Sequence, residues 1–144
     1  MGVRHEMPHC FVMDSTEDRR DYHRRLLAVV IDDDASVRES LPDLLKEFGL
    51  SPRAFASAEE FLASGCLKRT SCLILDIAMP GMSGPELQQE LKRGGHEIPI
   101  IFITGQIDAA IRARLIQQGA AGFLLKPFSE AALLAAIKLA LPAI

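Results

Sequence analysis

The chain has 144 residues, about one domain's length, and its 49% hydrophobic and 24% charged residues are typical of a soluble globular protein, which excludes a disordered or fibrous chain. Its net charge of −3 gives no basic field for nucleic acid or an anionic membrane. The sequence has no apolar run of the ~20 residues that a membrane helix needs and no apolar stretch of signal-peptide length near its start. We therefore expect a cytoplasmic protein that by itself binds neither nucleic acid nor membrane.

Residues 1–24 differ in character from the rest of the chain. They are rich in charge and histidine and show no sustained periodicity, so we expect a charged, flexible N-terminal extension before one domain over residues 25–144. The three cysteines form no metal-ligand spacing, and their odd number argues against a disulfide framework.

From residue 26 onward, apolar runs of strand length alternate with stretches of helical periodicity. The first run, Leu26–Ile31, is continuous and closes on three aspartates, which is typical of a strand buried on both faces. The second run, Pro52–Phe55, contains a proline that cannot donate a ladder hydrogen bond, so we place this strand at an edge of the sheet. The other three expected strands cover residues 72–75, 98–103 and 123–125.

Each run is followed by signals for a helix. Apolar residues from Val37 to Phe48 recur at helical spacing, Gly49 ends this helix, and Pro42 inside it should bend it. The four later helices should begin at or near Ser57, Ser83, Asp108 and Ser129. Five strands alternating with five helices predict an α/β fold, a single (βα)5 doubly wound domain with a parallel sheet covered on both sides.

Polar groups stand where four of these strands end. In doubly wound folds ligands bind outside the carboxyl ends of the strands, so these positions test directly for function. The residues are Asp32, Asp33 and Asp34 after the first strand, Asp76 after the third, Thr104 after the fourth and Lys126 after the fifth.

These residue types suit one kind of chemistry. Clustered carboxylates repel each other unless a cation lies between them, and oxygen ligands without histidine or cysteine select Mg²⁺, or Mn²⁺ in its place, over zinc. A carboxylate can act as a nucleophile and form an aspartyl-phosphate, while an ammonium and a hydroxyl group can hold the phosphoryl oxygens. The pattern indicates phosphoryl transfer to a carboxylate.

Four segments carry a resemblance to a known family. VVIDDDASVRESL, LILDIAMPGMSGPEL, PIIFITG and AAGFLLKPF, in this order and spacing, resemble the receiver domain of bacterial two-component response regulators. The DxxMPxMxG, ITG and KPF segments are most similar to the FixJ-like class. The resemblance covers about residues 26–140 and implies a flavodoxin-like sheet of strand order 2-1-3-4-5.

The resemblance implies a role for each acidic residue. Asp76 is both phosphoacceptor and metal ligand, Asp33 binds the metal directly, and Asp32 binds it through water. The backbone carbonyl of Ala78 completes the protein's share of the coordination. Asp34 has no role at the site in the family pattern.

It also implies how the phosphoryl group is held and sensed. Thr104 bonds one phosphoryl oxygen and Lys126 pairs with another, and the Lys126–Pro127 peptide bond is cis. Phe123 occupies the family's switch-aromatic position. Phosphorylation is therefore expected to change the surface formed by the last two helices and the fifth strand.

The function that the resemblance implies is that of a signalling phosphoacceptor, not an enzyme acting on other substrates. A sensor histidine kinase or a histidine phosphotransfer protein would donate the phosphoryl group to Asp76. A homodimer through the fourth helix, fifth strand and fifth helix is a further option. Only about one helix fits between Lys126 and Ile144, so we expect either a stand-alone regulator or a piece of a longer one.

Three other functions compete with this one. Asp32 to Ser36 contain D-x-D-x-S, which resembles the nucleophile loop of haloacid-dehalogenase-type phosphatases, but only Glu130 follows the lysine where those enzymes need further carboxylates, and Asp76 is left without a role. A receiver-like adaptor that works without phosphorylation is a second alternative. A flavodoxin-like nucleotide binder is a third, weakened by the anionic first loop.

Overall fold

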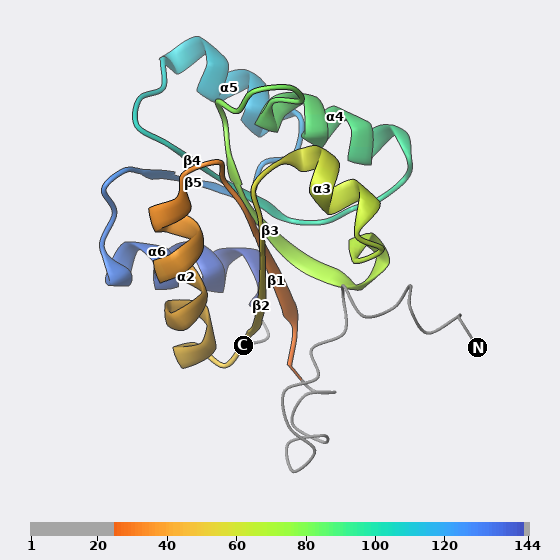
Figure 1. Cartoon of the computed structure of the whole chain (residues 1–144). Helices are drawn as coiled ribbons and strands as arrows, with labels where there is room; N and C mark the ends of the chain where they lie inside the picture. Colours follow the sequence, from red (N-terminus) through yellow and green to blue (C-terminus); the bar gives the residue numbers. More distant parts are fainter. Residues whose placement is uncertain (1–24, 143–144) are drawn as a thin grey trace, which may run out of the picture.

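The computed structural model describes residues 25–142 (Figure 1). The predicted extension over residues 1–24 lies outside the described residues. Within them, strands and helices alternate along the chain as the sequence predicts. The strands are β1 (Leu27–Ile31), β2 (Ser51–Phe55), β3 (Thr70–Asp76), β4 (Ile100–Thr104) and β5 (Gly122–Leu125). The helices are α2 (Ala35–Glu47), α3 (Ala58–Ala63), α4 (Gly84–Arg93), α5 (Ala109–Gln117) and α6 (Glu130–Ala140), with a short 3₁₀ turn, η2 (Leu67–Arg69).

All five strands form one parallel sheet in the order β2-β1-β3-β4-β5. This confirms the predicted strand order, and it confirms that the proline-containing β2 lies at an edge. The order reverses between β1 and β3, since the chain adds β2 on one side of β1 and then β3, β4 and β5 on the other. The carboxyl ends of β1 and β3 are therefore neighbours, at the place where this fold binds its ligands.

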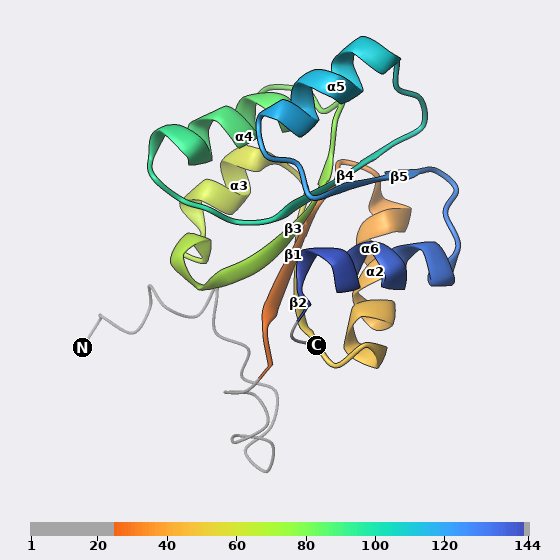
Figure 2. The ribbon, with the colours of Figure 1, turned by 180° about the vertical axis from the view of Figure 1, so that it is seen from behind.

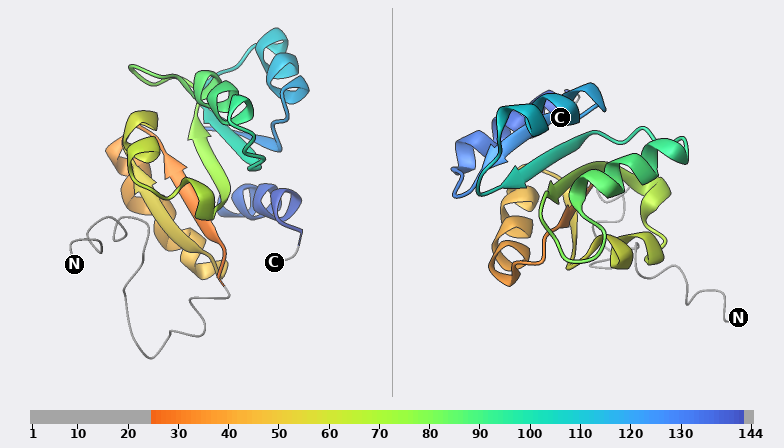
Figure 3. Two further views of the ribbon diagram at one scale, coloured as in Figure 1. Left: turned by 90° about the vertical axis from the view of Figure 1, so that its right-hand side faces the viewer. Right: turned by 90° about the horizontal axis from the view of Figure 1, so that it is seen from above.

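Helices cover both faces of the sheet (Figures 1 and 2). Helices α3, α4 and α5 pack on one face and α2 and α6 on the other, and the two views of Figure 3 show the same layers from further sides. Side chains of β1 alternate between the two cores: Val29 and Ile31 belong to the first and Val30 to the second. A continuous apolar strand is what such two-sided burial requires. Each fully buried Val, Leu, Ile or Phe contributes about 1.5–3 kcal/mol of transfer free energy.

Side chains cap the helices at the positions that the sequence indicates. The Oγ of Ser83 accepts from the backbone N–H of Glu86, whose carboxylate accepts in return from the N–H of Ser83, so this capping box is complete. The box at Ser57 is half formed, because the Glu60 carboxylate accepts from the N–H of Ala56 instead. Asp108 and Ser129 cap α5 and α6.

Helix α2 and strand β4 add detail to the prediction. Helix α2 continues through Pro42 and ends before Gly49, whose φ of +88° is in the left-handed region that favours glycine. Strand β4 begins at Ile100, two residues later than expected, directly after Pro99. None of the helices within residues 25–142 is long and apolar enough to cross a membrane.

Candidate functional site

The polar residues at the strand ends come together at the carboxyl edge of the sheet. One carboxylate oxygen from each of Asp32, Asp33 and Asp76 lies within 4.8 Å of the others. Asp32 and Asp76 are buried, with exposed fractions of 0% and 6%, while Asp33 is exposed. The cluster therefore reaches solvent at Asp33, where a small ion or a phosphoryl group can enter.

Backbone and side-chain bonds fix Asp32 at the end of β1. Its N–H donates to the carbonyl of Phe55 in the neighbouring strand (3.1 Å), and its Oδ1 accepts from the N–H of Asp34 (2.9 Å). The guanidinium of Arg38, one turn into α2, donates to the Asp32 carbonyl (3.0 Å). The carboxylate of Asp32 is thus held in one orientation.

Asp34 has a structural role. Its carboxylate accepts from the backbone N–H (2.9 Å) and the Oγ (2.8 Å) of Ser36 and so caps α2. These hydrogen bonds to Ser36 lower the pKa of Asp34. The family pattern gives this third aspartate no site role, and the structure provides the reason for its presence.

Lys126 brings a positive charge to the cluster. Its Nζ lies 3.0 Å from Oδ2 of Asp32 and 4.0 Å from Oδ2 of Asp76. Burial opposes its charge, but the close ion pair with Asp32 and the charge of Asp76 leave the pKa of Lys126 raised. Its backbone N–H donates to the Thr104 carbonyl (2.8 Å), which ties the ends of β4 and β5 together. The peptide bond to Pro127 is cis, as the family resemblance implies.

Burial is the main reason why Asp76 binds its proton tightly. Together with the negative charge of Asp32 it raises the pKa of Asp76 from its ordinary value of 3.8 to about 7. The charge of Lys126 and the backbone N–H of Ala78 oppose this shift and lower the pKa. One ammonium group therefore compensates the three carboxylates only in part.

The acidic cluster fits a divalent cation. When the three carboxylates are ionised, Lys126 leaves two net negative charges, which one Mg²⁺ would balance. Within residues 25–142, no donor makes a well-aligned hydrogen bond to the buried Oδ2 of Asp32, and the Lys126 ammonium lies against it as an ion pair. The donor set is oxygen only, which suits Mg²⁺ or Mn²⁺ and not zinc.

Thr104 and Phe123, the expected switch pair, lie on the neighbouring strands β4 and β5. The hydroxyl of buried Thr104 donates to the carbonyl of Gln106 (2.9 Å) and accepts from its N–H (3.2 Å). The half-buried ring of Phe123 stacks on Phe102 with 5.9 Å between centroids, and the guanidinium carbon of Arg112 lies 4.9 Å from its centroid. In this structure the hydroxyl of Thr104 is therefore hydrogen-bonded to the backbone two residues further along the chain.

Comparison with known proteins places this arrangement in a family. Residues 28–138 match the family model of the response regulator receiver domain. The chain belongs to that family. It is 44% identical over 118 residues to the response regulator protein TodT of Pseudomonas putida, covering 82% of this chain and 52% of TodT. It is 43% identical over 112 residues to the transcriptional regulatory protein FixJ of Azorhizobium caulinodans, covering 78% of this chain and 53% of FixJ.

A solved structure agrees with these sequence relatives. The response regulator StyR superposes with a TM-score of 0.76 at 44% identity, over 83% of this chain and 60% of that one. The predicted likeness to the FixJ-like class of receiver domains is therefore confirmed. The chain spans about half the length of the curated relatives it matches.

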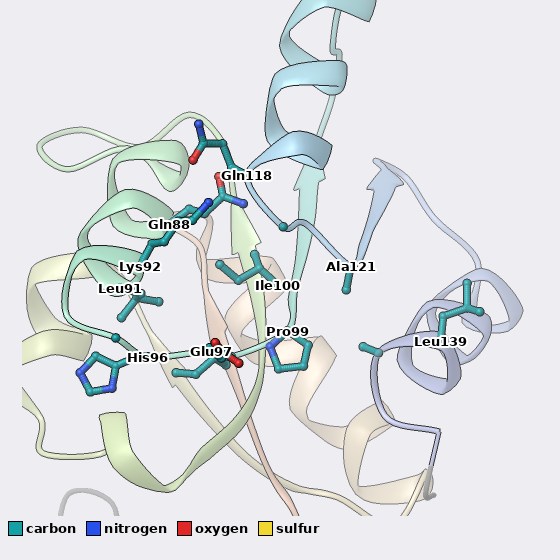
Figure 4. A pocket seen from close by; sticks show the side chains of 14 residues that line it. Gln88, Leu91, Lys92, His96, Glu97, Pro99, Ile100, Gln118, Ala121 and Leu139 are labelled. Carbon is teal, nitrogen blue, oxygen red and sulfur yellow. The ribbon is translucent and has the colours of Figure 1, made fainter.

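The receiver domain also has a hollow far from the acidic cluster (Figure 4). It has a volume of about 540 Å³ and lies at the opposite, amino edge of the sheet, between the ends of α4, α5 and α6. Buried Gln88 lines it, donates weakly to the carbonyl of Leu115 (3.4 Å), and has no hydrogen-bond partner for its Oε1 within residues 25–142. Among the described residues that line the hollow, Glu97 is the one carboxylate, so the acidic cluster at the other edge is the candidate site.

Two residues that contact the site region were missed by sequence reasoning. Arg38 holds the Asp32 carbonyl, and Glu59 in α3 accepts from the N–H of Met82 in the loop after β3 (2.9 Å). Arg38 lies one turn after the Asp34 cap, so helical spacing could have indicated it. No spacing rule indicates Glu59, which lies 23 residues before its partner. The structure leaves the predicted coordinating role of the Ala78 carbonyl as a prediction.

Proposed function

We propose that this receiver domain is a response regulator of a two-component phosphorelay that accepts a phosphoryl group on Asp76. The observation that carries the proposal is the surroundings of this one buried carboxylate. Asp32 and Asp33 lie within 4.8 Å of it, and the Lys126 ammonium lies 4.0 Å away. A nucleophile, an acidic pair and a cation at the switch point of the sheet are the parts of a carboxylate phosphorylation site.

The reaction starts from the ionised form of Asp76. One of its carboxylate oxygens attacks the phosphorus of a phosphohistidine, and the P–N bond breaks. The imidazole leaves with the bonding electron pair. Its other ring nitrogen already carries a proton, so the leaving imidazole is neutral. The product is an acyl phosphate, and no oxidant or further reactant is needed.

Each neighbouring residue has a proposed role in this reaction. Asp33 and Asp76, with the carbonyl of Ala78, would hold Mg²⁺ directly, and Asp32 would hold it through water. When bound, the ion neutralises charge on the phosphoryl oxygens and the carboxylates. Lys126 would pair with one phosphoryl oxygen as a point charge.

A groove beside the site suits the phosphoryl donor, a sensor histidine kinase or a histidine phosphotransfer protein. It has a volume of about 460 Å³ and runs between α2 and the loop from β5 to α6. Its mostly apolar lining consists of Val37, Ser40, Leu41, Leu44, Lys126, Pro127 and Phe128. An apolar helix surface of the donor could pack here and bring its phosphohistidine beside Lys126.

The response would appear on the surface of α5, β5 and α6. Each of these three elements exposes one large apolar side chain, Ile116, Leu125 and Leu139, with exposed fractions of 51%, 53% and 76%. We propose this surface as the one that phosphorylation changes and through which a homodimer can form. Residues 25–144 would be the receiver domain, preceded by the charged extension over residues 1–24, in a cytoplasmic protein.

The haloacid-dehalogenase alternative gains no support from the site. The carboxylate that would be its nucleophile, that of Asp32, is fully buried. One of its oxygens accepts from the N–H of Asp34, and the other lies 3.0 Å from Lys126. Asp76 combines the same cation with a less buried position, so it is the better nucleophile. The complete set of phosphorylation residues also favours a phosphoacceptor over an adaptor that is never phosphorylated.

The test is the metal dependence of phosphorylation. The chain is incubated with a small phosphodonor, and phosphoprotein is followed by mass spectrometry with Mg²⁺ or with a chelator. Chelation, or Asp33→Ala, should slow phosphorylation by about a hundredfold or more. Asp34→Ser is the matched control, because serine keeps the cap of α2 while removing a neighbouring charge. Equal rates with and without the chelator would refute the proposed mechanism.

A further inference from the structure

The loop between β3 and α4 follows the phosphoacceptor directly. It covers residues 77–83 and contains Ala78, whose carbonyl is a proposed metal ligand. At its base the N–H of Gly84 donates to the carbonyl of Ile77 (3.0 Å). A Cβ on Gly84 would clash with the carbonyl oxygen of Asp76, so the two ends of the loop meet in close backbone contact. Near its middle, Met79 is buried in the core.

The far end of the loop is held by a residue from another helix. The Oε2 of Glu59, in the first turn of α3, accepts from the N–H of Met82 (2.9 Å). The same oxygen lies so close to Gly81 that a Cβ there would be 2.8 Å from it. Gly81 also has a φ of +76°, in the left-handed region that favours glycine. Glu59 therefore touches two successive residues of the loop.

Helix α3 gives Glu59 a rigid base. Ser57 caps the helix by accepting from the N–H of Glu60. Phe61, two residues after Glu59, is fully buried and packs edge-to-face against Phe55 with 5.7 Å between ring centroids. A carboxylate in the first turn of a helix is also favoured by the N-terminal end of the helix dipole. The core thus sets the backbone at Glu59 independently of the loop, and the exposed Glu59 side chain reaches from that backbone to the loop.

From this geometry we propose that Glu59 is a positioning residue for the phosphorylation site. Its carboxylate holds the loop at Gly81 and Met82, while Met79 and the Ile77–Gly84 bond hold the loop elsewhere. Together these contacts fix the path of the backbone at Ala78 and so the direction of the carbonyl that would face Mg²⁺. This inference rests on the proposed function, because it assumes that Mg²⁺ binds at Asp33, Asp76 and Ala78.

Mg²⁺ binding to the full chain tests the proposal by calorimetric titration. Glu59→Ala removes one hydrogen bond to a charged acceptor and should weaken Mg²⁺ binding by about threefold to tenfold. Glu59→Gln keeps an acceptor oxygen and should stay within about twofold of the parent. Glu60→Ala is the matched control, because it removes the carboxylate of the next residue in the same turn. That carboxylate accepts from the N–H of Ala56 at the start of α3 and not from the loop.

Amide hydrogen exchange adds a readout that does not depend on the metal. Without Mg²⁺, the Met82 amide should exchange faster in Glu59→Ala than in the parent, and at the parent rate in Glu60→Ala. Equal Mg²⁺ affinity in parent and Glu59→Ala would overturn the proposal and leave the function standing. An equal loss of affinity in Glu60→Ala would also overturn it, by assigning the effect to helix α3 as a whole. A parent chain that binds no Mg²⁺ would overturn both proposals.

Discussion

The carboxyl group of Asp76 lies among groups that shift its pKa in opposite directions. Burial and Asp32 raise it, Lys126 lowers it, and the result is a pKa of about 7. In the absence of a metal ion the ionised carboxylate is therefore only partly compensated. A divalent cation would replace the proton and favour the ionised form, which is the nucleophile. The charge arrangement of the free protein thus prepares it for Mg²⁺.

This arrangement predicts how the stability of the metal-free protein depends on pH. The pKa of Asp76 is higher in the folded chain than its ordinary value of 3.8, so its contribution to stability is greatest below that value and is lost as the pH rises through about 7. Asp76→Asn resembles the uncharged form at every pH. It should raise the free energy of unfolding by on the order of 1–2 kcal/mol at pH 8 and by much less at pH 5.

Thermal or urea unfolding with a chelator present measures this difference. Added Mg²⁺ at pH 8 should stabilise the parent and have little effect on Asp76→Asn, because the variant lacks one of the proposed ligands. If the variant were less stable than the parent at pH 8 in the chelator, the conclusion that burial and Asp32 disfavour the ionised form of Asp76 would be wrong.

At the scale of the elements, we propose that β4 and β5 connect the site to the surface of α5, β5 and α6. Thr104 ends β4 and Phe123 lies in β5, next to Phe102 and Arg112. A phosphoryl oxygen offers Thr104 a charge-assisted hydrogen bond in place of its bonds to Gln106, worth about 1.5–3 kcal/mol. If Thr104 moves toward the phosphoryl group, Phe123 can turn into the space behind it and change the surface of α5, β5 and α6.

The test of this coupling is Thr104→Ala. The variant should still accept phosphate, more slowly, but lose the roughly ten- to hundredfold shift in partner affinity or self-association that phosphate brings. Thr104→Ser keeps the hydroxyl and is the matched control, which should respond like the parent. A full response from Thr104→Ala would show that Phe123 is a fixed core aromatic and that coupling takes another route.

Sequence patterns predicted the elements well because their signals are local. Alternating apolar runs and capping residues such as Ser83 and Ser129 depend on neighbours a few positions away. The site residues at the strand ends could be predicted because a parallel sheet brings those ends together. The contact between Glu59 and Met82 could not, because it joins a helix and a loop that only the packed fold brings side by side.

At the scale of the whole molecule, the site and the response surface lie on different parts of one small domain. The net charge of the chain is −3, which provides no basic field for DNA. We therefore expect this chain alone to signal through protein contacts and not by binding DNA. Salt-sensitive, sequence-selective DNA binding by these 144 residues would contradict this expectation.

Leu125 tests the response surface directly. Its side chain is 53% exposed at the end of β5, beside the last two helices and directly before Lys126. Leu125→Glu should abolish phosphate-dependent self-association, because it replaces one of the three exposed apolar side chains of the proposed interface with a charge. It should leave the rate of Asp76 phosphorylation within about threefold of the parent. Sedimentation velocity with and without beryllofluoride, a phosphoryl mimic, measures the oligomeric state of the unphosphorylated and the mimicked phosphorylated chain.

Ala63→Glu provides the matched control, since this exposed alanine lies in α3, which packs beside β2 at the other edge of the sheet from β5 and outside the proposed interface. The control should dimerise as the parent does. Unchanged dimerisation of Leu125→Glu would place the interface elsewhere.

The measurement that tests the central claim most directly is the location of the phosphoryl group. The full chain is incubated with Mg²⁺ and a small phosphodonor, and fragments are mapped by mass spectrometry. The account predicts one phosphoryl group, on Asp76, and no gain of phosphate mass in Asp76→Asn under the same conditions. Phosphate on Asp32 or another residue, or modification that persists in Asp76→Asn, would contradict it.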